Sequence, residues 1–278
     1  MIEKFHPEVI KKKAEIEEKL KYFDDPLFIF EPKEHAYTYE GIKFDSVTTF
    51  LKVFKEEFQK EYWAERKARE RGITAKEILA EWQALGDTAN ILGTAVHEWI
   101  EDFWVSWETE IIPDFPESPE NEVQKRAEKF LDIYGSKLIH FVPLTSELKL
   151  FSKKWKLAGT VDQPLLFWDE KQQKVLLVIG DWKTNKEFKD DNHKKGRYQK
   201  LHRPFNHLYA NSHNEYSLQI SLYRLILEQM GIETDSGFLC HIGPEGPAKL
   251  YPAKDLRQLL KVYLDHNRGD DQIDIFNV

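Results

Sequence analysis

The spacing of apolar residues predicts helices in the first half of the chain and mainly strands in the second. Residues 3–22 place apolar side chains at helical spacing, and residues 28–50 are typical of a short hairpin with a turn at Glu40 and Gly41. Residues 46–107 follow a helical pattern again, in which Thr74 to Glu77 has the form of a capping box. A proline-rich stretch ends this pattern, and residues 121–134 predict another helix.

The second half predicts three strands before its helices. The strands are expected at residues 146–151, 157–168 and 174–182, followed by a helix at 216–230, a strand at 238–242 and a helix at 255–265. This order predicts an α/β or α+β fold in one domain over residues 1–278, with a central mixed, mostly antiparallel sheet flanked by helices. Residues 1–135 would form a mostly helical part with a small hairpin, and residues 136–278 the core.

Composition excludes several classes of protein. The longest apolar run covers five residues, whereas a membrane-crossing helix needs roughly 20, so no membrane association is expected. The first residues lack the apolar core of a signal peptide, which favours the cytoplasm. Cys240 is the single cysteine and excludes an iron–sulfur cluster. A net charge of −8 argues against coating nucleic acid by bulk charge, but not against a local basic groove.

The candidate chemistry lies on the hairpin formed by the second and third of these strands. A hairpin that is symmetric about its turn at Lys171 and Gln172 places Asp162 opposite Asp181. Two carboxylates that face each other repel, so burying them requires raised pKa values or a cation. Hard oxygen ligands suit Mg²⁺ or Mn²⁺. Lys183 lies two residues beyond Asp181 and therefore points to the same face, where its ammonium can orient a water molecule beside a phosphate.

The alternative is a solvated charge cluster in which Lys183 only neutralises the two acids. An Asp-x-Lys tripeptide alone favours that interpretation. The opposed Asp162, and the glycines at 159 and 180 that permit close backbone approach, favour a functional site.

A basic segment follows this candidate site. Residues 183–203 contain eight basic and three acidic residues, a net charge of +5, with Phe188, Tyr198 and Phe205 in or next to the segment. Basic and aromatic side chains suit a phosphate backbone and stacked bases. The candidate DNA-binding residues here are Lys186, Lys195, Arg197 and Arg203. The alternative is a solvated loop without a ligand.

Five spaced motifs resemble the RecB-type exonuclease branch of the PD-(D/E)XK nuclease superfamily. They are Gly93-Thr94-Ala95-Val96-His97, Ser146-Glu147-Leu148, Gly159-Thr160-Val161-Asp162, Gly180-Asp181-Trp182-Lys183-Thr184 and the Gln219-x-x-x-Tyr223 helix. Two further segments resemble stand-alone phage and mitochondrial members of that branch: His35-Ala36-Tyr37 with Ser46-Val47-Thr48, and Pro204 to Leu208. The five motifs cover residues 90–225, and the weaker likeness extends to nearly the whole chain.

The resemblance implies a restriction-endonuclease-like core and a role for each matching residue. His97, Asp162 and Asp181 would bind the metal together with the carbonyl of Trp182, and Lys183 would position the attacking water. Glu147 would be the acid on the preceding strand. Substrate would contact residues Thr184, Gln219 and Tyr223. Without the resemblance, a lone helical histidine such as His97 is more often a packing residue, and Glu147 more often pairs with a nearby lysine.

The sequence therefore predicts a Mg²⁺- or Mn²⁺-dependent DNA exonuclease that acts at free ends in replication, recombination or repair. Its partners would be DNA and a replication or recombination protein. The chain has no Walker A motif, so a helicase would be a separate protein. Two alternatives are a non-catalytic nucleic-acid-binding accessory module and a structure-specific endonuclease or flap nuclease of the same fold.

Overall fold

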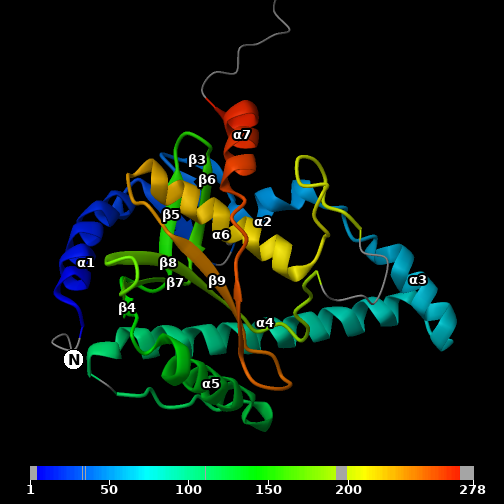
Figure 1. The fold of residues 1–278 in the computed structure, drawn as a ribbon. Helices are drawn as coiled ribbons and strands as arrows, with labels where there is room; N and C mark the ends of the chain where they lie inside the picture. The colour runs from blue at the N-terminus through cyan, green and yellow to red at the C-terminus, as the bar shows by residue number, and fades with distance from the viewer. Residues whose placement is uncertain (1–4, 33, 35, 110, 192–198, 270–278) are drawn as a thin grey trace, which may run out of the picture.

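A computed structural model describes residues 5–32, 34, 36–109, 111–191 and 199–269, and it confirms an α+β fold with mixed sheets flanked by helices (Figure 1). The helices are α1 Pro7–Leu20, α2 Val47–Phe50, α3 Lys60–Arg71, α4 Ala75–Val105, α5 Glu122–Ile133, α6 Ser212–Gln229 and α7 Arg257–Arg268. The strands are β1 Phe28–Glu31, β2 Ala36–Tyr39, β3 Ile42–Ser46, β4 Val142–Pro143, β5 Leu148–Ser152, β6 Leu157–Val161, β7 Gln163–Asp169, β8 Lys174–Lys183, β9 Ser236–His241 and β10 Lys249–Pro252.

The strands form two sheets rather than the single central sheet that the sequence predicts. One sheet has the order β1-β2-β3-β6-β5 and the other the order β10-β9-β8-β7-β4. Most neighbouring strands are antiparallel, as predicted, while β3 with β6 and β8 with β9 are parallel. The predicted strand at 157–168 is also wrong as one element, because the chain bends at Asp162 and passes from β6 in the first sheet to β7 in the second. Aspartate favours such a break, because its short side chain accepts hydrogen bonds from backbone N–H groups and so competes with the hydrogen bonds between strands.

The predicted register of the β7–β8 hairpin is correct. Leu166 faces Leu177 and Gln163 faces Gly180. Asp162, the residue before β7, therefore lies directly beside Asp181 of β8. Both strands are buried along most of their length, and the ladder continues on the other side of β8 into β9. The hairpin therefore fixes the two carboxylates from within the core of the molecule.

Helices cover the sheets from two sides. In Figure 1, α4 and α5 run below the strands of the second sheet and α6 crosses above them, with α7 beyond it. Helix α6 is buried around most of its circumference, and it begins four residues earlier than predicted because the side chain of Asn211 caps it by accepting a hydrogen bond from the N–H of Asn214. Helix α1 buries Val9, Ile16 and Leu20 on one face, as its amphipathic pattern predicts.

The helical pattern at 46–107 divides into separate elements. The chain is not helical at 55–59, and Gly72 ends α3 in the left-handed conformation with φ of 67°. The capping box at Thr74 then starts α4 as predicted. Ala64, Ala68 and Ile78 form a small core of their own between α3 and α4. Figure 1 shows that α3 and the first half of α4 project from the body of the molecule.

Two short strands were not predicted from sequence. Strand β4 contains two residues and ends in a proline, and β10 follows a segment rich in glycine and proline. Such short segments carry too few alternating positions to reveal a period. Among the described residues, no helix is long and apolar enough to span a membrane.

Replacing Gly159 by alanine is expected to destabilise the protein by about 1–3 kcal/mol, the usual cost of overpacking. A Cβ atom at this position would lie 2.7 Å from the ring of Tyr223, on buried strand β6. Gly86→Ala is the matched control, because that glycine is exposed in α4 with no atom within 4 Å of the new Cβ. The control is expected to gain about 0.5–1 kcal/mol from helix propensity. Urea denaturation of both variants tests this, and equal stabilities would contradict it.

Candidate metal centre and active site

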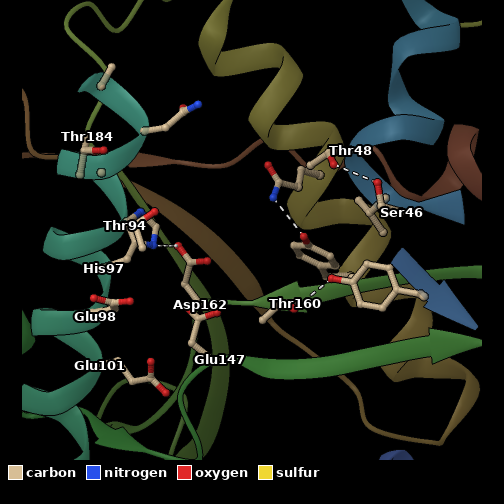
Figure 2. Close-up of a pocket in the computed structure, with 18 residues that line it drawn as sticks. Ser46, Thr48, Thr94, His97, Glu98, Glu101, Glu147, Thr160, Asp162 and Thr184 are labelled. Atoms are coloured by element: carbon tan, nitrogen blue, oxygen red, sulfur yellow. Dashed lines mark hydrogen bonds and ion pairs between the residues drawn. The ribbon is translucent and has the colours of Figure 1, made fainter. Parts of the chain in front are cut away.

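A pocket of about 660 Å³ lies between α4 and the strands that carry the candidate residues. Figure 2 shows Thr94, His97, Glu98 and Glu101 along α4 on one wall. The opposite wall is rich in hydroxyl groups, from the residues Ser46, Thr48 and Thr160. The hydroxyl of Tyr37, which also lines the pocket, lies 3.2 Å from that of Thr160. Glu147 and Asp162 lie between the two walls. The pocket is thus acidic on one side and uncharged but polar on the other.

Three side chains in this pocket meet the geometric requirement for a metal site. One ligand atom from each of His97, Glu147 and Asp162 lies within 4.8 Å of the other two. The Nδ1 atom of His97 is 3.6 Å from Oδ2 of Asp162, which also accepts a 2.7 Å hydrogen bond from the backbone N–H of Trp182. These three residues come from α4, from the residue before β5 and from the bend between β6 and β7. They can hold a metal ion together.

Asp181 lies next to this group but is directed towards Lys183. Its Oδ2 atom is 2.7 Å from Nζ of Lys183, and its side chain is 2% exposed. Apart from this ion pair, neither carboxylate oxygen has a hydrogen-bond partner among the described residues. A buried carboxylate with free lone pairs is costly unless a cation compensates it. This unmet demand fits a divalent cation nearby, and the set of oxygen and imidazole ligands suits Mg²⁺ or Mn²⁺.

Burial shifts the ionisation of the whole group. It raises the pKa of Glu147 to about 8, helped by the charges of Asp162 and Glu101. It also raises the pKa of Asp181 to about 6, against the opposing effect of the Lys183 ammonium. The pKa of His97 is lowered, first by burial and then by Lys183. The neutral imidazole is the state that ligation requires, whereas the Glu147 carboxyl must give up its proton when a metal binds.

Lys183 keeps its charge despite being buried. Desolvation would lower its pKa, but the carboxylates of Asp181 and Asp162 outweigh this effect and raise it. Its Nζ atom also lies 3.4 Å from Oε1 of Gln219, whose Nε2 donates a 3.0 Å hydrogen bond to the hydroxyl of Tyr223. Gln219 and Tyr223 line the pocket, as predicted, and they also connect α6 to the lysine. An ammonium is therefore held at the edge of the candidate metal site.

Close packing of α4 against the end of β8 brings His97 into the pocket. Gly93 lies one turn before His97, and a Cβ at that position would be 3.0 Å from Oγ1 of Thr184. Glu101 lies one turn after His97 and lines the same pocket, as its i+4 spacing predicts. Arg126 of α5 holds the other side of this contact, since its Nη1 donates hydrogen bonds to the carbonyls of Thr184 and Ile242.

Most of the predicted site residues gather here, whereas the described residues of the basic segment beyond Thr184 do not line the pocket. Six of them line the pocket: His97, Glu147, Asp162, Thr184, Gln219 and Tyr223. Lys183 contacts Gln219, and Asp181 contacts Lys183. Trp182 contributes its N–H to Asp162, and its indole is buried. Lys186 and Arg203 are exposed and do not line the pocket. Lys195 and Arg197 lie outside the described residues.

The expectation that aromatic residues of the basic segment stack on bases is wrong for two of the three. Phe188 is 7% exposed and Phe205 is fully buried, because both rings pack in the hydrophobic core. Tyr198 lies outside the described residues. Sequence reasoning also missed Arg126 and Tyr216 as neighbours of the site. Tyr216 could have been found from its position one turn before Gln219 on the predicted helix.

A divalent cation is expected to raise the melting temperature more at pH 8 than at pH 6. At pH 6 the Glu147 carboxyl, with a pKa of about 8, is protonated and the cation must displace the proton. Without a cation, the raised pKa lowers stability as pH rises from about 4.3, the unfolded value, towards 8. Thermal unfolding with and without Mn²⁺ at both pH values measures this difference.

Glu147→Gln is expected to weaken Mn²⁺ binding by about 10–100-fold in calorimetry, since it removes one ligand. Glu98→Gln is the control, because Glu98 is an exposed carboxylate on α4 that lines the same pocket but lies outside the group of three ligands. Equal Mn²⁺ affinities for the two variants would show that Glu147 is not a ligand.

The chain was compared with models of known protein families and with curated proteins. No family model and no curated protein matches it. The chemistry of the site therefore follows from its own side chains. These are a histidine and two carboxyls placed for a metal ion, with a third carboxylate and a lysine ion-paired beside them.

Proposed function

We propose that this chain is a Mg²⁺- or Mn²⁺-dependent DNA exonuclease of the PD-(D/E)XK type, related to the RecB-type branch. The observation that carries the proposal is that two features lie side by side at this pocket. A possible metal-binding group, formed by His97, Glu147 and Asp162, lies beside a buried lysine whose ammonium contacts Asp181. Both can promote phosphodiester hydrolysis, because negative charge develops on the phosphate while water attacks it.

Each side chain has a role in this reaction. A divalent cation bound by His97, Glu147 and Asp162, with Asp181 beside them, would supply Lewis-acid stabilisation of the phosphate charge. Lys183 holds the attacking water and offsets charge on the non-bridging oxygens. Asp181 keeps Lys183 charged and in place at 2.7 Å. The hydroxyl-rich wall, which includes Ser46, Thr48 and Thr160, can donate hydrogen bonds to the sugar–phosphate chain without adding charge.

The course of the chain around the pocket supports action at a free end. Thr48 and Ala89 both line the pocket, so the segment between them leaves the pocket and returns to it. Helices α2 and α3 and the first half of α4 belong to this segment, and its outer part has a core of its own. In the proposal, a DNA strand threads between this segment and the body of the molecule, and a strand that is threaded in this way must have a free end.

Lys183→Ala is expected to lower the rate of DNA cleavage by roughly 100-fold or more, the usual size of an electrostatic contribution to a transition state. Asp162→Asn should lose cleavage and Mn²⁺ binding together. Lys174→Ala is the matched control on the same strand, because that lysine is exposed at the opposite end of β8 and pairs with Asp235. The measurement is time-resolved digestion of end-labelled DNA with Mg²⁺, Mn²⁺ or EDTA.

Circular and linear substrates, single- and double-stranded, separate the possible activities. Metal-dependent loss of linear DNA alone supports an exonuclease, and the position of the label gives its polarity. Equal cleavage of circular single strands would replace the exonuclease by an endonuclease of the same fold. DNA binding without cleavage under any of these conditions would favour the accessory module instead.

A further inference from the structure

The ring of Tyr216 covers the ammonium of Lys183. The Nζ atom lies 4.4 Å from the ring centroid, well within the distance for a cation–π interaction. Tyr216 is on α6, one turn before Gln219 and two turns before Tyr223, so all three side chains share one face of the helix. The Gln-x-x-x-Tyr motif does not include this residue, and the proposed reaction has not used it so far.

Three groups surround the Lys183 ammonium. The carboxylate of Asp181 lies at 2.7 Å, the amide oxygen of Gln219 at 3.4 Å, and the Tyr216 ring forms the third side. The lysine side chain is 15% exposed. A lysine has four rotatable bonds, so an ammonium bound at one point only would sample several positions. Contacts on three sides restrict it to one.

An aromatic ring suits the third side better than another acid. Three carboxyls, Glu147, Asp162 and Asp181, already repel one another in this region. The negative face of a ring attracts an ammonium without adding a formal charge. The oxygen atoms of Asp181 and Gln219 lie 2.7 and 3.4 Å from Nζ, and the lysine side chain keeps 15% exposure through which water or phosphate would reach the ammonium.

The Tyr216 ring is itself held in place from behind. Phe188 lies 6.2 Å from it, between centroids, and stacks at 4.2 Å on Tyr251 of β10. Phe188 is buried, and Tyr216 packs against the main hydrophobic cluster. The ring is therefore a fixed surface rather than a mobile side chain.

We infer that Tyr216 is a positioning residue for Lys183, and this inference rests on the proposed nuclease function. Its ring face holds the ammonium in the orientation that serves the attacking water. Tyr216 is not among the pocket-lining residues or the metal-ligand group, so its loss should slow cleavage of bound DNA without weakening DNA or metal binding.

The test compares Tyr216→Phe, Tyr216→Leu and Phe188→Leu with the wild-type chain. Phe188→Leu removes a neighbouring buried ring that does not cover Lys183, and it is the control for general loosening of the core. At saturating linear DNA, Tyr216→Leu should lower kcat by about 10-fold with KM and Mn²⁺ affinity unchanged, as expected for a largely desolvated cation–π contact. Tyr216→Phe and Phe188→Leu should stay within about 2-fold of wild type.

A spectroscopic measurement tests the contact without relying on activity. The ε-methylene resonances of Lys183, assigned with Lys183→Arg, should be shifted upfield by the ring current in the wild type and in Tyr216→Phe. They should return to the ordinary lysine position in Tyr216→Leu. If Tyr216→Leu does not fold, the chemical shift in the wild type and in Tyr216→Phe is sufficient to show whether the ring contacts Lys183.

Several outcomes would overturn the inference. These are an unshifted Lys183 in the wild type, a Tyr216→Leu enzyme as fast as wild type, and a Tyr216→Phe enzyme as slow as Tyr216→Leu. A wild-type chain that cuts no DNA overturns the proposed function and the catalytic role of Tyr216 together. A shifted Lys183 resonance in that inactive chain would still establish the contact with Tyr216. The two measurements therefore distinguish failure of the proposed function from failure of the contact.

Discussion

The structure is organised around the cost of burying three carboxyl groups with one compensating lysine. Burial raises the pKa values of Asp162, Asp181 and Glu147, and repulsion by neighbouring carboxylates adds to the shift of Asp181 and Glu147. Lys183 offsets part of this charge, and a cation bound by the group would offset more. Nothing in the hydrophobic core requires the acids to be there. Their burial is a cost to folding, and the proposed metal-dependent function would account for it.

The parts of the fold that follow from local periodicity could be predicted from the sequence. The two-residue repeat of a strand fixes the β7–β8 register and, with it, the proximity of Asp162 to Asp181 and of Asp181 to Lys183. The i+4 repeat of a helix likewise places His97 and Glu101 on one face of α4. Such relations need no knowledge of how distant segments pack.

Relations between distant segments could not be predicted in this way. The bend at Asp162 divides an apolar stretch that has the pattern of one strand, and only the pairing of β6 with β3 and β5 shows that it belongs to two sheets. Phe188 lies in a basic segment with the composition of an exposed loop, but its ring is buried against Tyr251. In both cases, long-range packing overrides a local pattern. Arg126 is a further example, because its partners are the carbonyls of residues 184 and 242.

The passage of the chain from one sheet to the other at Asp162 has a mechanical consequence. Asp162 is attached to β6 on one side and to β7 on the other, while its carboxylate accepts the N–H of Trp182 and faces His97 on α4. Any rotation of one sheet relative to the other therefore changes the separation of the ligands. In the proposed metal site, the fit of an ion of given radius would therefore depend on the angle between the two sheets.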